Sequence, residues 1–448
     1  MEFQEQIHDY IQEHKEEIVD LLKSLIKIPS VRGEAEENAP FGRECARVLK
    51  FTQKLYQDHG FETELDAEGG YLFSYYGAGK KSLGLFAHAD VVPVSDDWTL
   101  TNPFEPIEKD GYIIGRGALD DKSAVVASLF CAKIIKELAL PFNSRLVCFT
   151  GASEETGMQD IKNYVQKHTA PDFSLVCDTA FPLYRGNKGI LHFVATQNAP
   201  MSKLEDFCGG SAFNIILGEV KAKIGDEFIV KKGISRHGAL PEGSLNAAYL
   251  LASELSARAD LPECDRIQLS FIATVLEKYY GEVFEIEHYD TDFGRLTITN
   301  GITKMNDGKI SLCFDMRYGA SLDIAEAKAK IDRFFEDNGW NVNFVLESKP
   351  FVVPEDDTHI VACMNAYKKF TNSSDARTFV NAGGTYARYL PRAAEIGTSF
   401  GGTPHAFELP QGHGHVHQPD ECISIDGLLN AIELTMLMLL ECDKQQEE

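Results

Sequence analysis

Two adjacent aspartates, Asp120 and Asp121, stand in the segment GRGALDDKSA, directly before the apolar run SAVVASLFCAKIIKEL. The length and composition of this run predict a buried helix. One acidic residue is enough to cap such a helix, because its carboxylate accepts free backbone N–H groups of the first turn. A cap therefore explains one of the two carboxylates, and the other is a candidate for chemistry.

Further acidic residues and a histidine follow three short apolar runs. They are His88 and Asp90 after LGLFA, Glu154 and Glu155 after RLVCFTGAS, and Asp178 after FSLVC. His88 and Asp90 lie two residues apart at a predicted strand end, so both point to the same side. A carboxylate commonly fixes the tautomer of a metal-bound imidazole. Taken singly, each group also has a structural interpretation, as a hydrogen-bonded pair, a solvated loop or a turn.

A histidine-rich segment, GHGHVHQPDE, supplies His413, His415 and His417. Such a tract favours metal binding, although histidines in an exposed loop need no ligand. Imidazoles and carboxylates together form a donor set that suits Zn²⁺ or Mn²⁺. The candidates are numerous enough for two metal ions that share a bridging carboxylate, an arrangement that activates water for hydrolysis.

The elements that must position these residues form an alternating pattern in the first part of the chain. Amphipathic segments at 16–27, 41–60 and 123–138 are separated by the apolar runs that precede the candidate ligands. Short strands between helices predict an α/β fold, with a mostly parallel sheet flanked by helices. Ligands of such sheets bind beyond the carboxyl ends of the strands, where the candidate residues stand.

The pattern changes near residue 185. EFIVKKGIS and then SLNAAYLLASELSARA predict a strand and a helix, and a turn at 306–308 predicts a hairpin before KISLCFDMRYG. DIAEAKAKIDRFFEDNG predicts a further helix, followed by the strand WNVNFVLES. We therefore expect an α+β lid domain at 186–372, inserted between the two catalytic segments 1–185 and 373–448.

The composition argues against several classes of function. The chain of 448 residues has a formal net charge of −25 at pH 7, whereas binding to nucleic acids or anionic membranes needs clustered lysine and arginine. No segment is apolar for long enough to span a bilayer, and none resembles a targeting signal. The ten cysteines are scattered without a C-x-x-C pair, which predicts reduced thiols and a cytoplasmic protein.

The order of these motifs resembles a known enzyme family. H-x-D at His88, G-R-G-x-x-D-D-K, E-E at Glu154, Asp178 and H-x-x-x-E at His417 follow one another along nearly the whole chain. This order is similar to that of the dinuclear zinc metallopeptidases and deacylases that include aminoacylase, carboxypeptidase G and carnosinase. The chain length, the large insert and the segment GGTYAR most resemble the bacterial dipeptidases of the PepV type.

The resemblance implies a role for each metal-binding candidate. Asp120 would bridge two divalent ions, with Zn²⁺ as the first choice and Mn²⁺ or Co²⁺ as alternatives. The remaining ligands would be His88 and Asp178 for one ion, and Glu155 and His417 for the other. His417 fits the H-x-x-x-E register, and His415 is the alternative to it.

The resemblance also implies which residues act beside the metal ions. Glu154 would be the general base, and Asp90 would orient His88. The peptide bond between Asp120 and Asp121 would be cis, with Asp121 holding that turn. The cap and the bridge would then be two roles of neighbouring residues.

Three residues of the insert match substrate-contacting positions of the family. His237 in SRHGALPEGSLNA would reach the scissile carbonyl, and Asn214 in GGSAFN and Arg317 in FDMRYG would hold the terminal carboxylate of the substrate. A solvated arginine and a turn asparagine are the structural interpretations of the last two.

The implied function is hydrolysis of the peptide bond of dipeptides with free termini, with β-alanyl dipeptides such as carnosine as possible substrates. A water between the two metal ions would attack, with Glu154 as the base. The alternatives are an N-acyl-amino-acid deacylase or a carboxypeptidase of the same family. We expect a monomer, because the larger insert could replace the partner that shorter relatives use.

Overall fold

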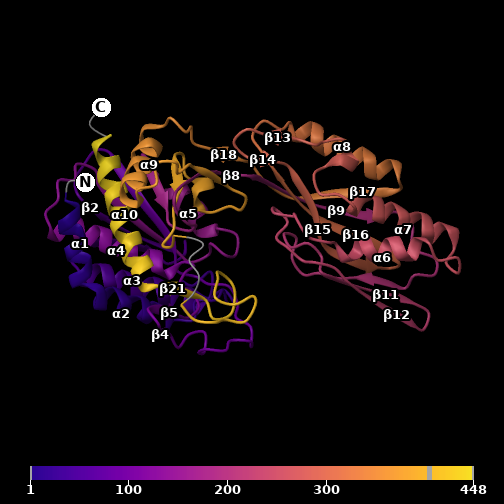
Figure 1. The fold of residues 1–448 in the computed structure, drawn as a ribbon, viewed down its shortest axis with the longest axis horizontal. Helices are drawn as coiled ribbons and strands as arrows, with labels where there is room; N and C mark the ends of the chain where they lie inside the picture. Colours follow the sequence, from indigo (N-terminus) through magenta and orange to yellow (C-terminus); the bar gives the residue numbers. More distant parts are fainter. Residues whose placement is uncertain (1–2, 401–405, 446–448) are drawn as a thin grey trace. The chain divides into compact units, whose positions relative to one another are not determined.

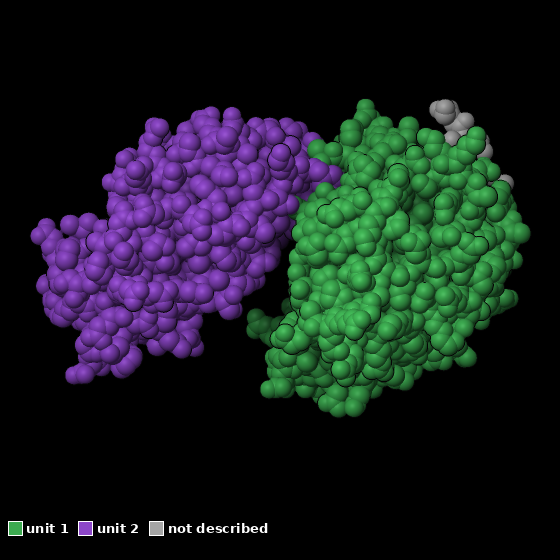
Figure 2. All heavy atoms as spheres, turned by 180° about the vertical axis from the view of Figure 1, so that it is seen from behind, with its two compact units in different colours: residues 1–186, 352–379, 384–448 green, residues 187–351, 380–383 purple. Residues whose placement is uncertain are grey.

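The chain divides into two units, which Figure 2 colours separately. The computed structural model describes residues 3–400 and 406–445. Unit 1 comprises residues 1–186, 352–379 and 384–448, and unit 2 comprises residues 187–351 and 380–383. The chain therefore leaves unit 1 and returns to it twice.

Unit 1 is built on a sheet with the strand order β1-β2-β6-β3-β7-β20-β8-β18, and β19 pairs with β8. The four central strands β6, β3, β7 and β20 run parallel, and β2 pairs with β6 in the antiparallel direction. The strands of this sheet are β1 (Glu62–Asp66), β2 (Tyr71–Tyr76), β3 (Ser82–His88), β6 (Arg145–Gly151), β7 (Phe173–Val176), β8 (Tyr184–Asn187), β18 (Phe351–Val352), β19 (Phe379–Asn381) and β20 (Ala393–Glu395).

Helices cover both faces of this sheet. Successive side chains of a strand point to opposite faces, so neighbouring residues of β6 contact different helices. Phe149 of β6 packs against Tyr164 of α5, with ring centroids 5.0 Å apart. The neighbouring Cys148 donates instead to the carbonyl of Ser128 in α4, 3.7 Å away. The helices of unit 1 are α1 (Gln4–Glu13), α2 (Lys15–Ile26), α3 (Arg43–Asp58), α4 (Lys122–Glu137), α5 (Gln159–Lys167), α9 (Thr358–Thr371), α10 (Ile425–Lys444) and the short η2 (Tyr386–Tyr389) (Figure 1). The predicted α/β class is confirmed.

The parallel strands end at one edge of the sheet. His88 at the end of β3 is in register with Gly151 at the end of β6, and Phe86 is in register with Val176 at the end of β7. The segments that follow these strands therefore emerge together. This topology explains why candidate residues from three separate motifs meet.

A small sheet brings a distant part of the chain to the same place. It consists of β4 (Ile107–Lys109), β5 (Tyr112–Ile114) and β21 (Cys422–Ser424). Cys422 of β21 pairs with Ile114 of β5, so the residues before Cys422 lie beside those after Ile114. The histidine-rich loop and the Asp120 segment become neighbours for this reason.

Unit 2 is an α+β structure around an antiparallel sheet of order β15-β16-β9-β17. The predicted hairpin is present, and Asp307 and Gly308 take positive φ angles of 50° and 75° at its turn. Its strands are β9 (Gly189–Gln197), β10 (Asp206–Cys208), β11 (Glu219–Ile224), β12 (Glu227–Lys232), β13 (Tyr289–Asp290), β14 (Gly294–Arg295), β15 (Thr297–Asn306), β16 (Lys309–Tyr318) and β17 (Trp340–Ser348). Its helices are α6 (Ala247–Ser256), α7 (Glu263–Leu276), η1 (Glu282–Phe284) and α8 (Ile324–Asp337).

Two further findings bear on the predictions from composition. All ten cysteines are free thiols, and eight of them are buried. Among the helices of the described residues, none has the length and apolar character needed to cross a membrane.

Candidate functional site

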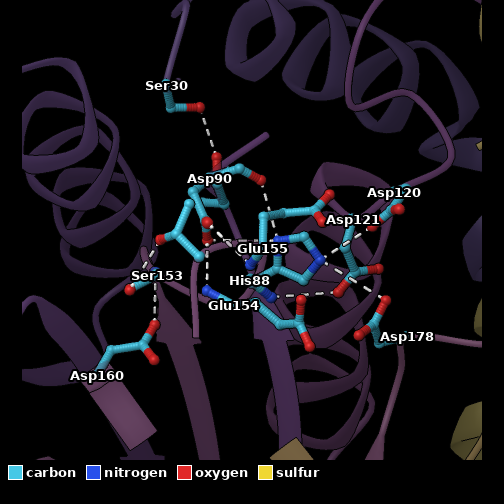
Figure 3. A network of polar contacts seen from close by, with 12 residues as sticks. Ser30, His88, Asp90, Asp120, Asp121, Ser153, Glu154, Glu155, Asp160 and Asp178 are labelled. Carbon is cyan, nitrogen blue, oxygen red and sulfur yellow. Dashed lines mark hydrogen bonds and ion pairs between the residues drawn. The ribbon is translucent and has the colours of Figure 1, made fainter. Parts of the chain in front are cut away.

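His88 is the centre of the polar cluster at the carboxyl edge of the sheet (Figure 3). Its side chain is 1% exposed, and its Nε2 lies 2.9 Å from Asp120 Oδ1 and 3.6 Å from Asp178 Oδ1. Its Nδ1 lies 3.0 Å from the backbone carbonyl oxygen of Asp90. Because a carbonyl oxygen can only accept, Nδ1 carries a hydrogen in this contact, and Nε2 is the ring nitrogen that faces the carboxylates.

His417 approaches the other side of the same aspartate. Its Nε2 lies 3.0 Å from Asp120 Oδ2 and 3.0 Å from Glu155 Oε1. Each oxygen of Asp120 therefore faces a different histidine. Of the three histidines in the loop, His413 instead pairs with Asp420 at 2.8 Å, and the backbone N–H of His415 donates to Gln418 Oε1.

The donor atoms form two overlapping groups. In each group the ligand atoms lie within 4.8 Å of one another, and the groups are His88, Asp120 and Glu155, and His88, Glu154 and Asp178. No lysine or arginine of residues 3–400 and 406–445 forms an ion pair with these four carboxylates. Imidazole and carboxylate donors gathered without a cationic side chain fit divalent metal ions.

Burial and the closeness of charged groups also shift the pKa values of the residues in this cluster. Burial raises the pKa of Glu154 well above its usual value, and the charge of Asp178 adds to this effect. Burial also raises the pKa of Asp178 and of Glu155. For His417 burial acts in the opposite direction, but hydrogen bonds to Asp120 and Glu155 raise the pKa to about 10. Proximity of like charges at low dielectric makes full ionisation unfavourable, and a bound cation would relieve it.

Asp90 supports the turn that carries the two glutamates. Its carboxylate accepts the backbone N–H groups of Glu154 at 3.1 Å and Glu155 at 3.2 Å. The predicted contact with His88 is made by the backbone carbonyl of Asp90, while the carboxylate oxygen stands 3.5 Å from Nδ1. Asp160, which the sequence motifs did not single out, accepts the N–H of Ser153 at 2.7 Å on the same turn.

The roles of the two adjacent aspartates differ. Asp121 stands at the N-cap position of α4, but its side chain makes no capping hydrogen bond. Its Oδ2 accepts the backbone N–H of His88 instead, at 3.2 Å. The Asp120–Asp121 peptide bond is cis, as the resemblance predicts. The carboxylate of Asp120 points to the histidines, and that of Asp121 holds the end of β3.

Unit 2 carries the remaining three predicted residues. Asn214 Nδ2 and His237 Nε2 are 3.5 Å apart, and burial together with the charge of Arg317 lowers the pKa of His237. Arg317 is 4% exposed and donates through Nη1 to the carbonyl of Ala382 at 2.8 Å. A guanidinium and a side-chain amide are both groups that can donate to an anion.

Asp315 orients the arginine and was not among the predicted residues. The Nε of Arg317 lies 3.0 Å from Asp315 Oδ1 and 2.8 Å from Oδ2. His192 of β9 approaches the same carboxylate at 2.9 Å. The D-x-R spacing in FDMRYG was the available signal, since residues two apart on a strand share a face.

Comparisons with known proteins agree with this architecture. Residues 84–441 match the family described as Peptidase family M20/M25/M40. The chain is 27% identical over 474 residues to the Bacillus subtilis protein named "Putative dipeptidase YtjP", covering 96% of this chain and 98% of that protein. Among solved structures, human carnosine dipeptidase 1 matches 99% of both chains with a TM-score of 0.63 and 16% identity.

A second solved structure comes from Bacillus subtilis and is described as a dinuclear metal binding peptidase from the M20 family. It matches 96% of this chain and 98% of its own, with a TM-score of 0.54 and 10% identity. These two structural matches establish the fold. The family match spans most of the sequence, so this chain belongs to peptidase family M20/M25/M40 and is a metallopeptidase.

Proposed function

We propose that this chain hydrolyses the peptide bond of dipeptides with free termini, with the help of two divalent metal ions. The observation that carries the proposal is the position of Asp120, whose two oxygens lie 2.9 Å from His88 and 3.0 Å from His417. The dipeptidase names of its relatives support the substrate class. β-Alanyl dipeptides are included in the proposal as candidate substrates.

We assign ligands to each ion from the contacts between the donor atoms. His88 and Asp178 would hold one ion, Glu155 and His417 the other, and Asp120 both. Zn²⁺ is our first choice because two imidazoles and three carboxylates suit it, and Mn²⁺ or Co²⁺ are alternatives. When bound, such ions polarise the scissile carbonyl and lower the pKa of the attacking water.

Glu154 would move the protons. Its side chain is 8% exposed, belongs to the donor group with His88 and Asp178, and has a pKa raised first by burial. A carboxylate with a raised pKa can take a proton from the attacking water and pass it to the leaving amine. Asp90 would keep Glu154 in place through the backbone hydrogen bond at 3.1 Å.

The residues of unit 2 would recognise the substrate. We assign Arg317 and Asn214 to its terminal carboxylate, because a guanidinium and an amide donate to both carboxylate oxygens. His237 would donate to the carbonyl oxygen as negative charge develops there.

The decisive experiment uses Glu154→Gln and a small panel of substrates. Turnover should fall by about 10²–10⁴-fold, the usual contribution of a general base, while the metal content measured by mass spectrometry stays at the wild-type value. Glu64→Gln, on the partly exposed strand β1, is the matched control. Near-normal turnover of Glu154→Gln would remove the base assignment.

The panel contains a dipeptide, the matching tripeptide, and the dipeptide with either terminus blocked. Cleavage of only the free dipeptide supports the proposal. Preferential cleavage of the amino-blocked form would indicate an N-acyl-amino-acid deacylase, and cleavage of the tripeptide from its carboxyl end a carboxypeptidase. A monomeric state, which light scattering would test, and a cytoplasmic location stay predictions.

A further inference from the structure

A buried glutamate joins the two segments that carry Asp120 and His417. Glu421 is 0% exposed, and its Oε1 accepts the backbone N–H groups of Leu119 at 2.8 Å and Asp120 at 3.0 Å. Its Oε2 accepts the N–H of Gly117 at 3.1 Å. One carboxylate therefore fixes the backbone of the whole turn that presents Asp120.

Arg116 completes this connection on the other side. It is 1% exposed, donates to Glu421 Oε2 at 2.6 Å, and donates through Nη2 to the backbone carbonyl of His417 at 3.1 Å. His417 has a positive φ of 63°, a conformation that costs free energy for any residue but glycine. The hydrogen bond from Arg116 is a contact that holds His417 in this conformation.

The ion pair between Arg116 and Glu421 affects the positions of neighbouring residues more than the stability of the fold. A buried ion pair contributes little net stability, because removing two charges from water offsets most of their attraction. The Arg116 and Glu421 side chains donate to and accept from each other and the backbone of Gly117, Leu119, Asp120 and His417. They therefore act on the positions of Asp120 and His417, and not on their donor atoms.

We propose that Arg116 and Glu421 are positioning residues that set the separation of Asp120 and His417 for the metal ion these two residues share. The inference rests on the proposed function, because it presupposes two metal ions. Orienting contacts behind metal ligands typically change affinity by about 10–100-fold. Loss of the pair should therefore weaken the ion at His417 more than the ion at His88, because the first ion depends on both displaced residues and the second on Asp120 alone.

The test is a titration of metal-free protein with Co²⁺, followed by visible absorption, which reports the coordination geometry. In Glu421→Gln, an amide N–H₂ meets donors where Oε2 now accepts from Arg116 and Gly117. We expect one of the two Co²⁺ ions to bind about 10–100-fold more weakly than in the wild type, with an altered spectrum, and the other to be affected less.

The matched control is Asp420→Asn, at the adjacent residue. Asp420 is also 0% exposed and accepts several hydrogen bonds, from Thr99, Leu100 and His413, but these bonds reach neither His417 nor the turn that presents Asp120. It should titrate with two Co²⁺ like the wild type. Equal weakening in both variants would show a general effect on the loop and overturn the proposal.

A second variant guards against misfolding of the single one. Arg116→Lys keeps a cation opposite Glu421 and leaves the bonds from the N–H groups of Gly117, Leu119 and Asp120 in place, so it should fold, as its thermal transition would show. It loses the planar fork that also reaches the carbonyl of His417, and it should weaken the same ion. Wild-type binding of two Co²⁺ by Arg116→Lys or by Glu421→Gln overturns the proposal. A wild-type protein that binds fewer than two ions overturns the proposed dinuclear site itself.

Discussion

The Oδ2 atom of Asp121 lies 3.2 Å from the backbone nitrogen of His88, whose N–H it accepts. The carboxylate thereby connects the start of α4 to the end of β3, and α4 is left without a side-chain cap. Asp121, at the N-cap of α4, therefore positions His88, a metal-ligand candidate at the end of β3.

This contact predicts different results for two substitutions of Asp121. Asp121→Asn keeps an oxygen that can accept from His88, so metal affinity should change little. Asp121→Ala removes the acceptor from a buried site and should lower metal affinity by about 10-fold or more. Calorimetric titration with Zn²⁺ would measure both. Equal affinities of the Asn and Ala variants would contradict the positioning role.

Asp90 supports a second prediction, on turnover. Its two oxygens accept the N–H groups of Glu154 and Glu155, and an asparagine offers one oxygen in place of two. Asp90→Asn should reduce kcat by about 10–100-fold, because the proposed base and a proposed metal ligand both shift. The comparison variant is Asp160→Asn, which alters the same turn at Ser153. Should Asp160→Asn be the more damaging of the two, the assignment to Asp90 would be wrong.

The metal-binding candidates were predictable because their environment is encoded locally. An acidic residue or histidine directly after an apolar run, as at His88 and Asp178, marks the carboxyl end of a buried strand. Parallel pairing then brings such ends together without further information. The alternation of helix and strand patterns gave the α/β class, and the turn residues at 306–308 gave the hairpin of unit 2.

The supporting residues could not be obtained in this way. Arg116, Asp160 and Asp315 owe their roles to hydrogen bonds with backbone or side chains that only tertiary packing brings near. For Asp315 the D-x-R spacing is the one local signal, because residues two apart on a strand share a face. The contact of His88 with the carbonyl of Asp90, rather than with its carboxylate, likewise depends on the backbone direction after β3.

Arg317 of unit 2 is the subject of a prediction about substrate recognition. Arg317→Lys loses the planar fork that Asp315 orients, and Asp315→Asn weakens that orientation. Both should raise KM for a dipeptide by about 10-fold or more, because a lysine does not replace a bidentate guanidinium, with a smaller effect on kcat. Against a dipeptide amide the variants and the wild type should be equally poor.

The control for this comparison is Arg185→Lys. Arg185 is 7% exposed and donates to the carbonyl of Val353, so it tests the cost of replacing any buried arginine. A KM increase in Arg185→Lys as large as that in Arg317→Lys would assign the effect to stability. An equal KM increase for the dipeptide amide would exclude a role in carboxylate binding.

A final prediction concerns stability against pH and lies away from the metal site. His359 of α9 is 3% exposed and stacks on Phe173 of β7, with ring centroids 4.6 Å apart. Burial, and then the charge of Arg392, lowers the pKa of His359 to about 4. The unfolded chain takes up this proton near pH 6.5, its usual value. The neutral ring thus contributes stability that is present above pH 6.5 and is lost as the pH falls toward 4.

Replacing His359 by glutamine removes this titration. Between pH 6.5 and 4 the free energy of unfolding of the wild type should fall more steeply than that of His359→Gln, by at most about 1.4 kcal/mol per pH unit for one proton. Urea unfolding in the presence of a chelator measures both proteins without a contribution from metal loss. Above pH 6.5 the difference between them should be constant. Parallel curves from pH 4 to 6.5 would mean that the folded and unfolded chains protonate His359 equally, and burial would then not be what lowers its pKa.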